Sequence, residues 1–115
     1  RLTVRNRATG QVRSLAFPDE TYEVNLQGLP EYKSPYLRFV YESMVYPSTV
    51  FDENLATGER TKRKTREVPG HDPAKYDSKR IWATAPDGTK VPISVLFKKG
   101  IAMDGRSPAL LYGYG

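Results

Sequence analysis

The sequence of 115 residues contains no cysteine, which excludes disulfide bonds and cysteine-based metal sites and permits a reducing compartment. With one histidine, His71, and no cysteine, the chain has too few ligands for a zinc site. His71 would also be the only candidate histidine for a Ser-His-Asp triad within the chain. No run approaches the roughly 18 apolar residues of a membrane-spanning helix, and residues 1–10 lack the apolar stretch of a signal peptide. We therefore expect a cytoplasmic protein that binds neither a metal nor a membrane.

Sequence motifs for chemistry are also scarce. There is no Gly-x-Ser-x-Gly nucleophile motif, and no glycine-rich phosphate loop opens a helix. The carboxylates Asp72, Asp77, Asp87 and Asp104 stand in turn-like settings, where aspartate bonds its own backbone. The sequence predicts no cofactor.

The charge is unevenly distributed, with a net charge of +5. Residues 60–66 carry five of the basic side chains, which are Arg60, Lys62, Arg63, Lys64 and Arg66. Such a run is usually a solvated strand face, and this is the interpretation we favour. The alternative is a non-catalytic basic β module that binds an acidic partner or nucleic acid, although no RNA-recognition or zinc-finger spacing accompanies the basic run.

Alternating polar and apolar residues predict a mainly β chain. Residues 1–17 form one expected hairpin, residues 21–26 and 36–44 two single strands, and residues 48–68 a second hairpin. Both hairpins turn through Ala-Thr-Gly, and the turn glycines Gly10 and Gly58 stand 48 residues apart. Short strands repeating at about this period are typical of β-propeller blades.

The pattern changes after residues 69–78, where Pro, Gly, Asp and Ser cluster as in a linker. We place a domain boundary near residue 72. Residues 80–100 then read as a hairpin around Pro-Asp-Gly, and residues 108–113 as a continuous apolar run. Such a run predicts a central strand covered on both faces, as at the start of an α/β sheet.

The last residues, Tyr112 to Gly115, read Tyr-Gly-Tyr-Gly. In the simpler interpretation, the glycines let the backbone turn while the tyrosine rings pack and their hydroxyls reach water. In the functional interpretation, the phenol of Tyr114 projects into the crevice at the carboxyl end of a buried strand, where ligands of open α/β sheets bind. A phenolic donor there would stabilise an oxyanion.

Three stretches together carry a specific resemblance: residues 36–59, residues 72–100 (with "DGTKVP" and "FKKG") and "PALLYGYG" at 108–115. In this order they resemble the prolyl oligopeptidase family of serine peptidases, and most of all its oligopeptidase B branch. The resemblance implies a β-propeller joined to an α/β-hydrolase domain. Residues 1–72 would then be the terminal propeller blade segment, and residues 73–115 the first strands of an incomplete hydrolase domain.

The same resemblance implies a function for the parent enzyme, namely hydrolysis of short peptides after Arg or Lys, with folded proteins kept out by the propeller. It assigns Tyr114 the role of oxyanion-hole hydroxyl. The serine, aspartate and histidine of the family triad would lie beyond residue 115. We therefore expect the chain to be a segment of a longer enzyme, inactive alone, that self-associates or needs the rest of that enzyme.

Overall fold

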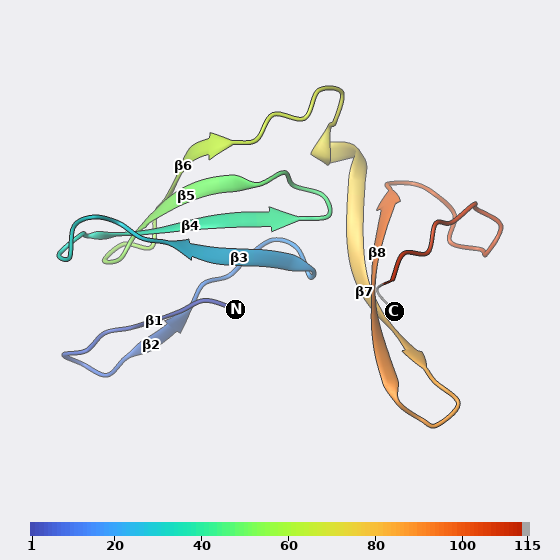
Figure 1. The fold of residues 1–115 in the computed structure, drawn as a ribbon, viewed down its shortest axis with the longest axis horizontal. Helices are drawn as coiled ribbons and strands as arrows, with labels where there is room; N and C mark the ends of the chain where they lie inside the picture. Colours follow the sequence, from blue (N-terminus) through green and yellow to red (C-terminus); the bar gives the residue numbers. More distant parts are fainter. Residues whose placement is uncertain (114–115) are drawn as a thin grey trace.

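The computed structural model describes residues 1–113 and shows a β protein built of three separate antiparallel sheets (Figure 1). The first sheet is the hairpin β1–β2, the second has the order β3-β4-β5-β6, and the third is the hairpin β7–β8. The strands are β1 (Thr3–Arg5), β2 (Val12–Ser14), β3 (Tyr22–Gln27), β4 (Tyr36–Ser43), β5 (Thr49–Asn54), β6 (Arg60–Thr65), β7 (Tyr76–Thr84) and β8 (Lys90–Lys98), and one 3₁₀ turn, η1, spans Pro73–Lys75.

The four-stranded sheet has the form of a propeller blade, because each strand pairs with the one before it. Phe39 of β4 and Phe51 of β5 lie directly opposite each other, with ring centroids 5.7 Å apart. Because side chains alternate along a strand, one face of the blade is aromatic and the other carries mostly polar side chains. This alternation confirms the mainly β, blade-like part of the predicted fold.

The hairpin β1–β2 lies against the aromatic face of the blade, and the core forms between them (Figure 1). Leu15, Phe39 and Tyr41 are buried at its centre, and Phe39 is fully covered. Phe17 adds a ring stacked 5.2 Å from Tyr41. The core therefore lies between the hairpin β1–β2 and the four-stranded blade, and not inside one sheet.

The two predicted Ala-Thr-Gly turns have the same local structure. In the first, Asn6 Oδ1 accepts bonds from the N–H groups of residues 8 and 9, at 2.9 and 3.1 Å. In the second, Asn54 Oδ1 accepts from residues 56 and 57 at the same two distances. The glycines that follow, Gly10 and Gly58, have φ of 74° and 76°, in the left-handed region that glycine adopts without strain. The 48-residue repeat of the sequence is thus a repeat of structure.

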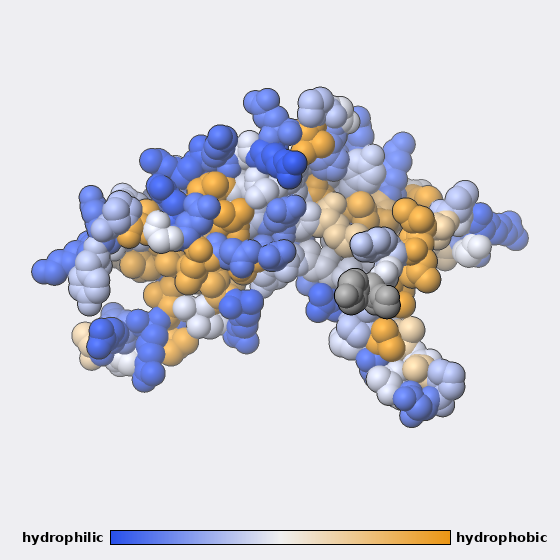
Figure 2. All heavy atoms as spheres, in the orientation of Figure 1, coloured by the Kyte–Doolittle hydropathy of each residue, from blue (hydrophilic) through white to orange (hydrophobic). Residues whose placement is uncertain are grey.

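The third sheet is a long hairpin with strands of nine residues each. Ile81 pairs with Ile93, and Ala83 pairs with Val91, so apolar side chains of the two strands share one face. Strand β7 begins at Tyr76, inside the segment expected to be linker. Most side chains of β7 are exposed. Figure 2 shows apolar side chains at the surface of the hairpin β7–β8 as well as on the blade.

Residues 108–113 do not form the covered strand that the apolar run predicts. They have no strand structure, and Leu110 and Leu111 are 95% and 87% exposed. Of the two partners expected for this run in the isolated chain, another chain or residues 80–97, the second is not observed, since the run forms no ladder with β7 or β8. A strand needs a hydrogen-bonded neighbour, and in the described part of the chain β7 and β8 pair only with each other. Its place in a complete hydrolase sheet stays a prediction.

Within residues 1–113, no helix has the length and apolar character needed to cross a bilayer.

Candidate functional site

The predicted catalytic residue Tyr114 lies outside the residues that the structure describes. The neighbouring Tyr112 is 91% exposed. A Cβ added at Gly113 would meet no atom within 4 Å, so open space surrounds the segment that leads to Tyr114. The assignment of Tyr114 therefore stays a prediction.

The most elaborate polar site within the described chain is centred on two adjacent acids of β5, Asp52 and Glu53. Because successive side chains of a strand point to opposite faces, these two carboxylates serve opposite sides of the blade. Glu53 is fully buried, and Asp52 is 8% exposed. Each is ion-paired with two arginines. Buried carboxylates are rare unless they are paired, so this arrangement needs all four cations.

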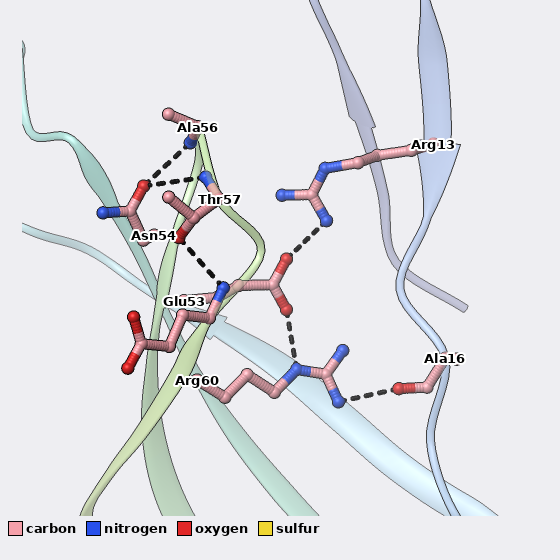
Figure 3. Close-up of polar contacts among 8 residues, drawn as sticks. Arg13, Ala16, Glu53, Asn54, Ala56, Thr57 and Arg60 are labelled. Carbon is pink, nitrogen blue, oxygen red and sulfur yellow. Dashed lines mark hydrogen bonds and ion pairs between the residues drawn. The ribbon is translucent and has the colours of Figure 1, made fainter.

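Glu53 joins the hairpin β1–β2 to the blade (Figure 3). Its two carboxylate oxygens accept from Arg13 Nη1 at 2.6 Å and from Arg60 Nε at 2.7 Å. Arg13 belongs to β2, and Arg60 faces Glu53 across the β5–β6 ladder. Charge-assisted bonds of this length are about twice as strong as neutral ones. The carboxylate is therefore a specific connection between two neighbouring units.

Arg60 makes further contacts at the same junction. Its Nη1 donates to the carbonyl oxygen of Ala16 at 2.7 Å (Figure 3). The guanidinium also lies over two aromatic rings, 4.7 Å from the centroid of Phe17 and 5.5 Å from that of Phe39. A cation over a ring face is attracted by the quadrupole of the ring. Arg60 thus fixes the chain that leaves β2 to the aromatic face of the blade.

Asp52 organises the opposite face. Arg38 donates to its two oxygens with Nε at 2.6 Å and Nη2 at 2.8 Å, and Arg63 Nε lies 3.2 Å away. Arg63 is the extra residue of a bulge in β6, since the register shifts between the pairs Val50–Lys64 and Phe51–Lys62. The hydrogen bonds and charge of Arg38 hold the pKa of Asp52 below its ordinary value. In turn, the hydrogen bonds that Arg38 donates to Asp52 raise the pKa of Arg38.

These ion pairs change the meaning of the basic run at residues 60–66. Arg60 and Arg63 are paired with acids of the blade, so part of the positive charge of the run is neutralised within the chain. Lys62, Lys64 and Arg66 remain exposed. Sequence reasoning missed the acidic partners, although the hairpin register around the turn at Gly58 places Arg60 opposite Glu53. The basic-module alternative loses support accordingly.

A hollow of about 650 Å³ lies beside the core on the aromatic face of the blade. Its wall includes Phe17, Phe39, Tyr41 and Phe51 together with Arg60 and Lys62. The hydroxyl of Tyr41 donates to Asp19. Burial, together with this bond to a carboxylate, raises the pKa of Tyr41 far above its ordinary value.

His71 stands where the chain leaves the blade. Its Nε2 is 2.8 Å from the carbonyl oxygen of Val45, and its ring stacks on Tyr76 at 5.5 Å. These contacts are those of a structural residue. In the part of the chain that the structure describes, no group of three or more His, Asp and Glu lies close enough to hold a metal ion.

Comparison with known proteins agrees with the blade. Residues 1–66 match the family described as "Prolyl oligopeptidase, N-terminal beta-propeller domain". Among curated proteins, the chain is 39% identical to dipeptidyl aminopeptidase BI of Pseudoxanthomonas mexicana over 95% of its length and 15% of that protein. It is 31% identical to protease 2 of Moraxella lacunata over 92% of its length and 16% of that protein.

A solved structure extends the likeness beyond the blade. Oligopeptidase B from Trypanosoma brucei, in a closed form with covalently bound antipain, is 36% identical with a TM-score of 0.75. The alignment covers 90% of this chain and 15% of that one. The chain therefore spans about one sixth of the length of its relatives, and its propeller match and these similarities show that it belongs to the prolyl oligopeptidase family.

Proposed function

We propose that the whole protein containing this chain is a serine-type oligopeptidase that hydrolyses short peptides after Arg or Lys. The carrying observation is the order of units, a propeller blade followed by a long hairpin, which aligns with oligopeptidase B over 90% of the chain. In this proposal residues 1–72 end the propeller, and residues 73–115 supply the first strands of the α/β-hydrolase domain.

Tyr114 is the residue of this chain to which the proposal gives a part in the chemistry. Attack of a serine on the scissile carbonyl places negative charge on the carbonyl oxygen, and a phenol donates a hydrogen bond to it in the transition state. The second donor would be the backbone N–H after the nucleophile. Loss of one such donor typically costs about 3 kcal/mol of transition-state stabilisation. The nucleophile itself would come from outside this chain, so the chain alone is expected to be inactive.

The decisive experiment uses the whole protein and four fluorogenic peptide series. Two carry Arg or Lys before the scissile bond, one carries Pro, and one releases dipeptides from a free amino terminus. The last two series are included because relatives include prolyl endopeptidases and a dipeptidyl aminopeptidase. The proposal predicts the highest kcat/KM for Arg and Lys. Preference for Pro or for dipeptide release would keep the peptidase assignment and refute the specificity.

A fluorophosphonate probe tests the serine chemistry separately. It should label the whole protein and leave the isolated 115-residue chain unlabelled. Labelling of the isolated chain would contradict its expected inactivity. If the whole protein stays unlabelled and cleaves none of the four peptide series, the oligopeptidase assignment itself is refuted.

A further inference from the structure

The hairpin β7–β8 has few attachments to the blade. Of the side chains of β7, only Ser78 is buried. Within residues 1–113, one hydrogen bond joins residues 1–66 to the hairpin, and it runs from the backbone N–H of Arg80 to Glu20 Oε2 at 2.9 Å. Its two residues are 60 positions apart in the chain. This bond is therefore the specific polar link between the two units.

The donor is a backbone group on the open edge of β7. Arg80 lies opposite Ser94 in the β7–β8 ladder, and because its N–H reaches Glu20, that N–H points away from β8. Unpaired N–H groups on an edge strand need an acceptor, from water or from another part of the chain. Glu20 supplies a charged one, so the contact depends on the Arg80 backbone and not on its side chain.

The acceptor is presented by a well-anchored segment, residues 17–21. At one end, Phe17 lies 4.8 Å from the ring of Tyr22 and is part of the aromatic cluster. Next to Glu20, the carboxylate of Asp19 accepts from the hydroxyl of Tyr41. At the other end, Thr21 is only 4% exposed. Glu20 is thus held in position from both sides, while its own side chain projects outward.

Both partners of the bond are exposed, so water competes for each of them. An exposed hydrogen bond such as Glu20–Arg80 breaks readily, in contrast to the buried bonds of Glu53. We propose that Glu20 is a positioning residue that acts as a reversible latch between the propeller blade and the β7 edge. It fixes how the hairpin, and the segment leading from it to Tyr114, is placed relative to the propeller. This inference rests on the proposed function, because it assigns the hairpin to the catalytic domain.

The test measures the separation of the two units directly in the whole protein. Dyes are attached through unnatural amino acids at Tyr32, which is 94% exposed on the blade, and at Lys99, just after β8, and single-molecule energy transfer is recorded. Loss of one exposed charge-assisted bond should raise the population of separated molecules about fivefold. We expect this for Glu20→Ala. Glu20→Gln retains an acceptor oxygen and should restore much of the wild-type distribution.

Two variants of Arg80 provide the matched comparison. Arg80→Ala keeps the backbone donor and should behave as wild type. Arg80→Pro removes the N–H at an edge position where proline is tolerated, and it should reproduce Glu20→Ala without adding to it in the double variant. An unchanged distribution in Glu20→Ala overturns the latch, whether or not Arg80→Pro folds.

Peptide hydrolysis gives a second readout. In Glu20→Ala, kcat should fall more than KM rises for a short substrate, because without the Glu20–Arg80 bond fewer molecules hold the hairpin β7–β8 against the blade. The energy-transfer result stands even if the protein cleaves no peptide. Failure of the latch is therefore distinguishable from failure of the oligopeptidase assignment, which the fluorophosphonate probe decides.

Discussion

Replacing Glu53 by glutamine tests whether the buried carboxylate holds the hairpin β1–β2 to the blade. Glu53 is fully buried and accepts from Arg13 at 2.6 Å and from Arg60 at 2.7 Å. Glutamine has nearly the same shape, but it is neutral and offers one acceptor oxygen in place of two. Its amide NH₂ would face one of the guanidinium groups, donor against donor.

The expected cost follows from the burial of the three partners. Removing one member of a buried ion pair costs about 3–5 kcal/mol when the remaining charge stays dry. Here the side chains of Arg13 and Arg60 keep 41% and 29% exposure, so water reaches them once the carboxylate is lost. We therefore expect a smaller loss, about 2 kcal/mol, confined to the junction.

Native-state hydrogen exchange of the whole protein, followed by mass spectrometry, measures this loss locally. A cost of about 2 kcal/mol corresponds to roughly 30-fold faster exchange in peptides covering β2 and β5. Asp52→Asn is the matched control, because the neighbouring acid faces the other side and contacts Arg38 and Arg63. It should leave β2 protected. Unchanged exchange of β2 in Glu53→Gln would refute the connection.

Three further predictions concern other sites. In the whole protein, Tyr114→Phe should retain the fold and lower kcat about a hundredfold with little change in KM; an unchanged kcat where chemistry limits the rate rejects the oxyanion assignment. The hydrogen bonds that Arg38 donates lower the pKa of Asp52, so the stability contributed by this ion pair is fully present above the pKa of Asp52 in the unfolded chain and is lost as pH falls through its pKa in the folded protein. Hydrogen exchange of β4–β5 should therefore accelerate in acid below about pH 4, and Asp52→Asn should abolish that pH dependence. Because the two turns are alike, Asn6→Ala and Asn54→Ala should each cost about 1 kcal/mol locally by hydrogen exchange, and clearly unequal costs would contradict their equivalence.

Local structure was the part that the sequence predicted well. The alternation of apolar residues located the strands of the blade, and the repeated Ala-Thr-Gly located two turns with the same bonds around Asn6 and Asn54. These features depend on neighbouring residues, whose chemistry is visible in a short stretch. The family assignment came from several such stretches taken in order.

Contacts between units were harder to predict. Nothing near Glu53 in the sequence reveals that Arg13 will reach it, because that pairing depends on how the hairpin β1–β2 docks. The Glu20–Arg80 bond uses a backbone donor and so has no residue signature. For residues 108–113, the apolar composition indicates that the run needs neighbouring strands or helices to bury it, but not whether such neighbours are present.

The strand order also bears on how the protein folds during synthesis. Each strand of the blade pairs with the strand that precedes it in the sequence, so β3 to β6 can pair one after another as they leave the ribosome. The hairpin β7–β8 likewise closes on itself around a short turn. Its exposed side chains, such as Trp82 and Ile81 at 60% and 48%, stay uncovered after the hairpin has closed. Apolar side chains exposed on a newly closed hairpin are the kind of surface that chaperones bind.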